Sequence, residues 1–443
     1  MMSSLALLMI GVAILIVVLV LGVPVPYSFG ITVIYMVFVF GYPESTIIPV
    51  GFNKMGSMTL LAMPMFILVG SIMEKGRIGK ALIDFVEMIF GRIRGGLGIV
   101  SVISCAVFGA ICGSSAATLS CIGGIVYPKL REQGYDEGFA TSLVLNAAPL
   151  GLLIPPSSTM ILYAWLSGQS VLACFLATII PGIILATLLC AVTFFHAKKN
   201  PKLDPKVLMA ANEIPAPFTK KGAARARYAI PALLMPILVL GGIYGGIMTP
   251  TESSAVAVLY AIPVAIWVYK GMRGKELKEC FLKAVKTSGA LCGMLFTVMI
   301  LSRFFVLENL PTLLIDVMSR FGGGTREGVL IMVNIFMVII GMLMDDGSGI
   351  TLCTPILLPL CVQYGVSPIH FAAILGINLG MGCVTPPTAP LLYMGCGIAG
   401  TPVNKALKPT FIMILCAWLP TLILTTYIPD LSLFLPRLAG LLK

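Results

Sequence analysis

The chain has 443 residues, of which 58% are hydrophobic and only 11% charged, and its mean hydropathy is +1.03. Soluble domains carry about a quarter charged residues, so this composition excludes a soluble globular protein and predicts an all-α membrane protein. The net charge is +11, but the basic residues lie in short clusters between apolar runs, which indicates topology signals and not a nucleic-acid surface.

The first elements along the chain are apolar runs long enough to cross a bilayer. They predict helices at 4–22, 28–41 and 57–74. The next stretch, 75–94, alternates charged and apolar residues at helical spacing, and such an amphipathic segment is expected to lie in the plane of the membrane interface.

Residues 98–130 are apolar but interrupted by the sequence CGSSAAT, which predicts a hairpin that enters and leaves the membrane on one side. A helix over 138–168 follows, and the double proline in GLLIPPSSTM (151–160) breaks it. A further helix is predicted over 171–195.

The second half of the chain repeats the first. A shift of 231 residues superimposes the double prolines, Pro155 with Pro386 and Pro156 with Pro387, and also Gly151 with Gly382. The sequence MDDGSGI then corresponds to the first hairpin tip, and GCVTPPTAPL (382–391) corresponds to the first broken helix. The two halves are therefore about 1–195 and 228–430, joined by a basic, proline-containing linker.

Each half crosses the membrane five times if the hairpin counts as no crossing, so the second half is predicted to be inverted. The positive-inside rule places the linker 196–227 in the cytoplasm and the N-terminus in the periplasm. With that orientation, only six of the 29 basic residues fall outside: Lys54, Arg303, Arg320, Arg326, Arg437 and Lys443.

These patterns divide the chain into eight predicted parts. Each repeat has scaffold helices, then a helix with an interfacial arm, then a hairpin, a broken helix and a last helix. The predicted parts are 1–56, 57–97 and 98–195 for the first repeat, 196–227 for the linker, 228–286, 287–324 and 325–430 for the second repeat, and 431–443 for the C-terminal tail.

Two broken helices and two hairpins in inverted halves point to a transport site near the membrane midplane. Unwound carbonyl groups and hydroxyls are hard oxygen ligands, which suit Na⁺. The first predicted cation site comprises Ser114, Ser115, Gly151, Ile154 and Pro156. The second comprises Asp346, Gly347, Ser348, Gly382, Thr385 and Pro387. The residues predicted to contact an anionic substrate are Ser114, Ser115, Ser157, Asp345, Thr385 and Thr388.

Plainer explanations remain open for several of these residues. Asp345 and Asp346 could lie in solvent or cap a half-helix, Gly113 and its serines could serve close helix packing, and the prolines could merely kink a helix. Glu252 is expected to stabilise the first turn of its helix, capped by Thr249 or Thr251. The two histidines, His196 and His370, are expected at solvated segment ends.

The motifs GSSAAT, IPPSS, GIMTPTESSAVAVLYA, MDDGSGI and TPPTAPLLY, taken together and in this order, resemble the large membrane subunit of tripartite ATP-independent periplasmic (TRAP) transporters. The resemblance covers essentially the whole chain. It implies an elevator-type secondary transporter in which both hairpins and both broken helices move against a scaffold.

The resemblance also implies Na⁺-driven import of an organic acid across the bacterial inner membrane. The substrate would be of the sialic acid or C4-dicarboxylate type, with a preference here for sialic acid. The expected partners are a small membrane subunit of the Q type and a periplasmic substrate-binding protein, and no cofactor is expected besides Na⁺ as the coupling ion.

Three other functions are compatible with parts of the pattern. A stand-alone Na⁺-coupled carboxylate carrier of the same architecture would lack a binding protein. A channel fits less well, because inverted repeats imply alternating access. An enzyme is not expected: no histidine lies near the serines within a span, the two aspartates are adjacent on one segment, and no phosphate-binding loop is present.

Overall fold

The computed structural model describes residues 4–203, 220–308 and 324–442. Within this part all regular secondary structure is helical. The helices of the first half are α1 (Ser4–Val20), α2 (Val25–Phe40), α3 (Glu44–Met55), η1 (Met58–Leu61), α4 (Ala62–Lys75), α5 (Ile78–Phe90), α6 (Gly96–Cys112), α7 (Ser115–Glu132), α8 (Glu137–Ala147), α9 (Leu150–Leu153), α10 (Ser158–Ser167), α11 (Val171–Lys199) and η2 (Pro201–Leu203).

The described elements of the second half follow a comparable order. Its helices are α13 (Lys220–Tyr244), α14 (Pro250–Pro263), η3 (Val264–Val268), α15 (Gly274–Leu307), α17 (Arg326–Leu343), α18 (Asp346–Gln363), α19 (Pro368–Gly382), α20 (Pro390–Ala399), α21 (Val403–Met413), η4 (Ile414–Trp418), α22 (Leu419–Tyr427) and α23 (Asp430–Leu438).

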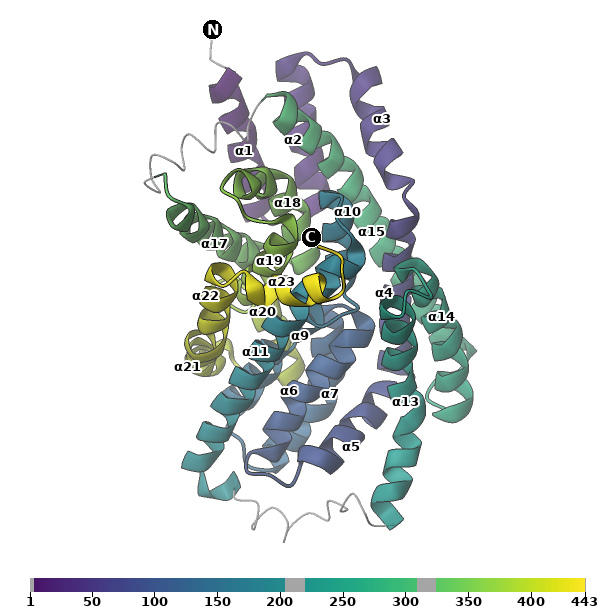
Figure 1. Cartoon of the computed structure of the whole chain (residues 1–443). Coiled ribbons are helices and arrows are strands. Elements are labelled where there is room, and N and C mark those ends of the chain that lie inside the picture. Colours follow the sequence, from purple (N-terminus) through teal and green to yellow (C-terminus); the bar gives the residue numbers. More distant parts are fainter. Residues whose placement is uncertain (1–3, 204–219, 309–323, 443) are drawn as a thin grey trace.

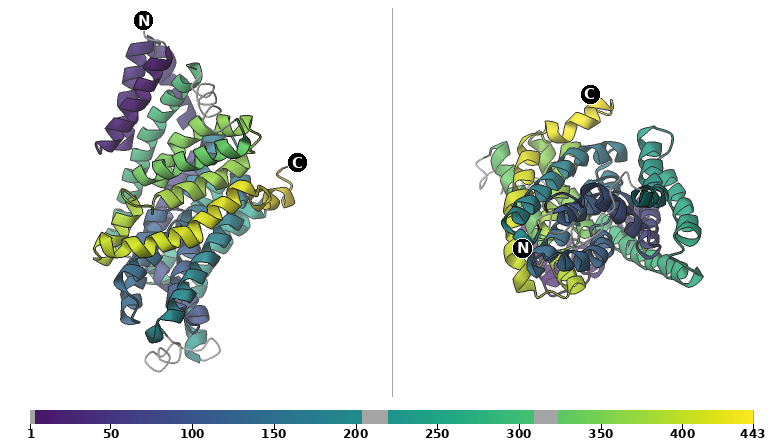
Figure 2. Two further views of the ribbon diagram at one scale, coloured as in Figure 1. Left: turned by 90° about the vertical axis from the view of Figure 1, so that its left-hand side faces the viewer. Right: turned by 90° about the horizontal axis from the view of Figure 1, so that it is seen from below.

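One side of the molecule is built from helices of both halves. The 34-residue helix α15 packs along α2, α3 and α4, and α14 packs on α4. At 1.5 Å per residue α15 is about 50 Å long, enough to cross the hydrocarbon layer with residues to spare. Viewed from below, the helices of residues 220–307 lie on one side of the molecule and the yellow C-terminal helices on the other (Figure 2).

The other side holds the two predicted hairpins and the two predicted broken helices, which the structure confirms. Hairpin 1 consists of α6 and α7 in the lower half of the molecule, and hairpin 2 consists of α17 and α18 in the upper half (Figure 1). The second part of each broken helix packs against the hairpin of the other repeat, α10 on α18 and α20 on α7. This reciprocal exchange is what two inverted repeats around a shared centre produce.

Seven helices in the described residues are long and apolar enough to cross a membrane, or eight if the pair bent by 44°, Glu137–Leu153 with Ser158–Ser167, counts as one span. The amphipathic helix α5 buries its apolar face, including Ile78, Leu82 and Val86, and packs on α6 and α13. The chain is a multi-pass helical membrane protein.

The start of α14 confirms the capping role expected for Glu252. Thr249 Oγ1 accepts a hydrogen bond from the Glu252 backbone N–H, and the Glu252 carboxylate accepts one from the Thr249 backbone N–H at 2.7 Å. This is a capping box, which satisfies two backbone donors that the helix leaves unpaired.

Thr249→Ala is expected to lower the free energy of unfolding by about 1 kcal/mol, because it removes this cap. The melting temperature of the purified protein in detergent measures the effect. Thr187→Ala is the matched control, since Thr187 bonds only within its own helix, to the Ile183 carbonyl. Equal melting temperatures for both variants would contradict a stabilising role of the cap.

Several expectations need correction or extension. No separate helix was predicted over 44–55, yet α3 forms there and packs on α15. His370 is not solvated: it is 1% exposed, and its Nε2 lies 2.7 Å from the Thr425 carbonyl oxygen. The part of the expected C-terminal tail up to Leu438 is helix α23, which packs on α11. Of the predicted linker and of the second interfacial arm, 204–219 and 309–323 lie outside the described residues.

Candidate functional site

The tip of hairpin 1 is a tight turn made by two small residues. Gly113 ends α6 in the left-handed region, at φ 61°, a conformation that glycine adopts at little cost. Ser114 then caps α7, its side chain accepting a hydrogen bond from the Ala117 N–H. Thr118 Oγ1 donates to the Ser114 carbonyl at 2.8 Å. The turn therefore holds its hydroxyls in defined positions next to a helix N-terminus.

The tip of hairpin 2 is built in the same way but carries carboxylates. Asp345 caps α18 by accepting hydrogen bonds from the N–H groups of Gly347 and Ser348, and the Ser348 hydroxyl also donates to it. This is the capping role that remained open for Asp345. Asp346 is the first residue of α18, and the helix is capped by Asp345 and not by Asp346. Its carboxylate is thus available for contacts outside its own hairpin.

The two tips meet. Ser115 Oγ donates a hydrogen bond to Asp346 Oδ2 at 2.8 Å. These residues are 231 positions apart, which is the shift that aligns the double prolines. Equivalent residues of two repeats contact each other only close to the axis that relates them, so the tips lie at the centre of the inverted repeat.

Hairpin 1 is pressed against the first break, residues 154–157 between α9 and α10. The Ser158 hydroxyl donates to the Gly113 carbonyl at 2.7 Å, and Ser157 caps α10 by accepting from the Met160 N–H. A Cβ atom added at Gly113 would lie 3.1 Å from the Pro156 carbonyl oxygen, and one added at Gly151 would lie 3.4 Å from the Ser114 carbonyl oxygen. The first predicted cation site is therefore brought together in part: Ser114, Gly151 and Pro156 lie at the contact between tip and break, and Ile154 lies within the break. The Ser115 side chain bonds to Asp346 of hairpin 2 instead.

The second break, residues 383–389 between α19 and α20, is packed on hairpin 2 but is more open. Cys383 Sγ donates to the Met344 carbonyl at 3.5 Å, and Thr385 Oγ1 donates to the Met381 carbonyl at 2.6 Å. Pro387 and Thr388 are exposed, whereas their counterparts in the first repeat, Pro156 and Ser157, are buried. The two breaks are therefore alike in sequence and unlike in environment.

Helix α19 packs against hairpin 2 through a contact between two glycines. A Cβ atom at Gly382 would lie 2.6 Å from the Gly341 Cα atom, so the two backbones touch. Gly347 and Ser348 are buried at the tip itself. The second predicted cation site thus divides into a tip group, Asp346 to Ser348, and a break group, Gly382 to Pro387, on adjoining elements.

A cavity of about 300 Å³ lies between the tips and the scaffold helices α4 and α15; we call it the tip cavity. Of the predicted residues, Ser114, Asp345, Asp346 and Gly347 line it. Ser115 reaches it only through its bond to Asp346, whereas Ser157, Thr385 and Thr388 do not line it. Its volume is at the lower end of the range of roughly 300–1,000 Å³ found for small-molecule sites.

The sequence analysis missed six serine, threonine and lysine residues that line the tip cavity: Ser71, Ser120, Ser158, Thr159, Lys283 and Thr287. Lys283 is the only basic residue among the described residues that line this cavity. Its Nζ lies 2.9 Å from Glu74 Oε2, and the Ser120 hydroxyl donates to the other oxygen of Glu74 at 2.9 Å. The four-residue spacing of Lys283 and Thr287 places them on one face of α15, a signal present in the sequence but not separable from a topology signal.

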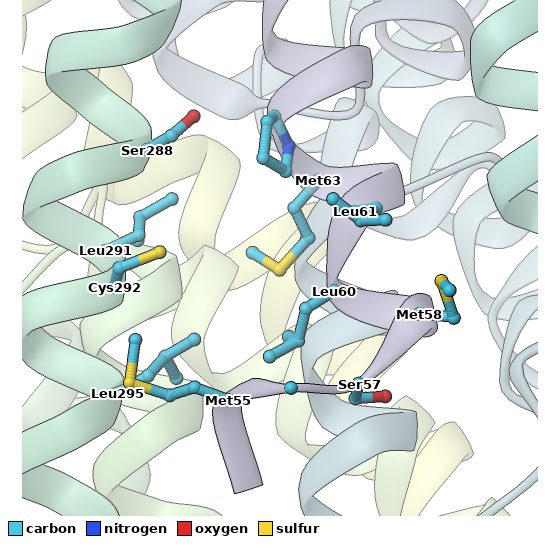
Figure 3. A pocket seen from close by; sticks show the side chains of 12 residues that line it. Met55, Ser57, Met58, Leu60, Leu61, Met63, Ser288, Leu291, Cys292 and Leu295 are labelled. Carbon is cyan, nitrogen blue, oxygen red and sulfur yellow. The ribbon is translucent and has the colours of Figure 1, made fainter. Parts of the chain in front are cut away.

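A second cavity, of about 350 Å³, adjoins the first and is apolar. Figure 3 shows Met63, Leu291 and Cys292 directed into the same space, which lies between the α3–η1–α4 segment and α15. Met63 and Leu291 line both cavities and so form the wall between them. No charged residue lines this second cavity in the described part of the chain, and its only hydroxyl groups there are those of Ser57 and Ser288.

Comparison with known proteins identifies the family. Residues 12–431 match the family described as "Tripartite ATP-independent periplasmic transporter, DctM component". The chain belongs to the TRAP large-permease family. TRAP large permeases sit in the inner membrane and work with a small permease and a periplasmic binding protein. They are transporter components and not enzymes.

Named relatives agree with this assignment. The TRAP permease is 35% identical, over 86% of its length and 87% of the relative, to the C4-dicarboxylate TRAP transporter large permease protein DctM of Pseudomonas aeruginosa. It is 28% identical to the sialic acid TRAP transporter permease protein SiaT of Haemophilus influenzae, over 87% of this chain and 61% of SiaT. Its fold is similar to the crystal structure of the Alcanivorax borkumensis YdaH transporter, with a TM-score of 0.57, 14% identity and 85% of each chain covered.

Proposed function

We propose that this TRAP permease imports an organic acid together with Na⁺, by an elevator movement of the two hairpins and two broken helices against the scaffold. The observation that carries the proposal is the contact between Ser115 and Asp346 at the centre of the inverted repeat. A carboxylate among the helices of a membrane protein is costly to bury, which makes Asp346 a candidate ligand for a cation. The tip cavity beside them offers the space for the substrate.

The first Na⁺ is proposed to bind where hairpin 1 meets the first break, with ligands from Ser114, Ser115, Gly151, Ile154 and Pro156. The close approach of tip and break supports this site, because it brings carbonyl groups of both segments toward one point. The second Na⁺ is proposed to bind at Asp346, Gly347 and Ser348, with Gly382, Thr385 and Pro387 from the second break. Na⁺ at both places would order the tips and offset the charge of Asp346 before the substrate arrives.

The substrate is proposed to be an organic acid held in the tip cavity. Hydroxyls of Ser114, Ser158, Thr159 and Thr287 and the ammonium group of Lys283 are the donors that a carboxylate needs, and all of them line this cavity. A C4-dicarboxylate and a sialic acid are the two classes to compare. The higher identity to the relative named for C4-dicarboxylates makes that class the first to test.

A separate small permease of the Q type and a periplasmic binding protein are the proposed partners. The proposed orientation has the N-terminus in the periplasm and the linker 196–227 in the cytoplasm. An inside-negative potential would favour inward movement by about 2.3 kcal/mol per 100 mV for each net positive charge carried. Reversed membrane orientation in cysteine-accessibility labelling would overturn this part of the proposal.

Uptake into proteoliposomes tests the function. The permease, with and without a small permease and a binding protein, is given an inward Na⁺ gradient and radiolabelled succinate, N-acetylneuraminate or a neutral sugar. We expect uptake of one acid class only with Na⁺ outside and with both partners present. Full-rate uptake by the permease alone would favour a stand-alone carrier, and uptake that is indifferent to Na⁺ would refute sodium coupling.

Lys283→Gln is expected to raise the KM for the organic acid by roughly tenfold, because it removes the single cation found in the cavity lining and a charged hydrogen bond of about 1.5–3 kcal/mol. The Na⁺ dependence should change much less, since Lys283 is on α15 and is not among the proposed ligands of either ion site. Initial-rate uptake at varied acid and fixed Na⁺ measures this effect. Lys286→Gln, an exposed neighbour that does not line the cavity, is the matched control. An unchanged KM in Lys283→Gln would remove Lys283 from the substrate site.

A further inference from the structure

A groove separate from the tip cavity lies between the end of α11 and the start of α21. Residues around the turn that joins α7 to α8 also line it. Its volume is about 1040 Å³. None of the residues that line it lines the tip cavity. We call it the basic groove.

Each of the two helical walls of the basic groove is apolar at one end of the groove and basic at the other end. On α11, the lining residues run from Leu188 and Val192 through Phe195 to Lys199. On η4 and α21, they run in the opposite chain direction, from Cys416 and Ile412 to Lys408 and Lys405. One end of the groove is therefore apolar on both walls, and the other end is basic on both walls.

The apolar end opens toward the surroundings of the protein and not toward its core. Phe195 is 61% exposed and Ile412 is 45% exposed. Neighbouring apolar side chains on the same helices, Phe411 and Leu415, are also exposed. In a chain that spans the bilayer, such surfaces face acyl chains, so the apolar end lies at hydrocarbon depth and the basic end near the headgroups.

Most charged groups at the basic end already have partners, and two lysines do not. Lys405 Nζ pairs with Glu137 Oε2 at 2.7 Å, the Arg131 guanidinium donates to the Tyr135 carbonyl, and His196 stacks on the Phe139 ring with centroids 3.6 Å apart. Lys199 and Lys408 make no ion pair within the described residues, and they lie on opposite walls. The lining as a whole has four Lys or Arg residues against Asp136 and Glu137, which leaves a surplus of positive charge.

We propose that the basic groove binds one anionic phospholipid, with its phosphate between Lys199 and Lys408 and its acyl chains along Leu188, Phe195 and Ile412. Two lysines without an ion pair among the described residues, one on each wall, suit a phosphodiester, and the apolar walls suit the acyl chains attached to it. A free inorganic or glycerol phosphate would satisfy only the basic end. Because α21 also packs on α8, the first part of a broken helix, the bound lipid contacts the elements that carry the transport site.

Native mass spectrometry of the full chain in detergent tests the proposal. The protein is titrated with dioleoyl-phosphatidylglycerol and with dioleoyl-phosphatidylcholine, which differ only in headgroup. We expect a saturable one-to-one adduct with phosphatidylglycerol, and roughly 25-fold weaker binding in the double variant Lys199→Gln/Lys408→Gln, since each lysine near an anionic headgroup contributes about a factor of five. The double variant Lys275→Gln/Lys278→Gln, with two exposed lysines of α15 outside the groove, should bind like the wild type.

A diazirine-labelled phosphatidylglycerol adds a readout of position. Crosslinks are expected in peptides containing α11 and α21, and an excess of glycerol 3-phosphate should not displace the lipid. Equal binding of the two phospholipids, unchanged binding in Lys199→Gln/Lys408→Gln, crosslinks confined to other helices, or displacement by glycerol 3-phosphate would each overturn the proposal. A sharp monomer peak for every variant shows that any loss of binding is not a loss of fold.

Discussion

Asp346→Asn is expected to raise the Na⁺ concentration that half-saturates uptake by at least about tenfold, equivalent to about 1.4 kcal/mol, or to abolish uptake. Asparagine keeps the size of the side chain and an oxygen that can accept the Ser115 hydrogen bond, so the change removes mainly the negative charge. A cation at the hairpin tips loses its one charged ligand candidate within the two proposed sites. The Na⁺ dependence of initial uptake rates in proteoliposomes measures the effect.

The control for this variant is Asp430→Asn. Asp430 pairs with Arg437 at 2.7 Å on exposed α23, far along the chain from both tips, and surface pairs of this kind contribute little. Ser115→Ala is a second probe: it removes the hydroxyl that bonds Asp346 and is expected to weaken the Na⁺ dependence by a smaller factor. Unchanged Na⁺ dependence in both Asp346→Asn and Ser115→Ala would remove the tips from the ion sites.

Gly109→Ala is expected to destabilise the protein by about 1–3 kcal/mol or more, because hairpin 1 and the first broken helix touch through their backbones there. A Cβ atom at Gly109 would lie 2.3 Å from the Gly151 Cα atom, far closer than non-bonded carbons approach, and neither backbone can rotate away as a side chain can. The melting temperature in detergent should fall, and Na⁺-dependent uptake should fall with it, since the shift separates the tip from its break.

Gly124→Ala, in the same hairpin, is the control, and its expected effect on stability is the opposite. No atom lies within 4 Å of a Cβ atom added at Gly124, and alanine is favoured over glycine in a helix by roughly 0.5–1 kcal/mol. This variant should be as stable as the wild type or slightly more stable. If Gly109→Ala melts at the wild-type temperature, that result would contradict the close packing of hairpin 1 on the first broken helix.

Much of the architecture could be predicted because short sequence motifs indicate it. Glycine, serine and double proline inside apolar runs mark the tips and breaks, and their recurrence at a shift of 231 relates the halves. Ser115 and Asp346 are related by that same shift, but their contact was not predicted, because the sequence does not show how closely the two tips approach. Glu252 was assigned correctly because a capping box is complete within four residues.

The rest depends on contacts between segments far apart in the chain. Lys283 was grouped with the topology signals because its partner, Glu74, is 209 residues away, and only the packing of α15 on α4 brings both to the cavity. His370 looks like a segment end in the sequence, yet α22 covers it and supplies the Thr425 carbonyl. Similar sequences at the two breaks gave no reason to expect that Ser157 would be buried and Thr388 exposed.

Direct binding of ²²Na⁺ to the purified permease tests the central claim, that the joined tips and breaks hold the coupling ion. The account predicts saturable binding to the wild type and to Asp430→Asn, with strongly reduced binding in the double variant Ser115→Ala/Asp346→Asn. Equal ²²Na⁺ binding by that double variant and the wild type, in protein of equal melting temperature, would contradict it.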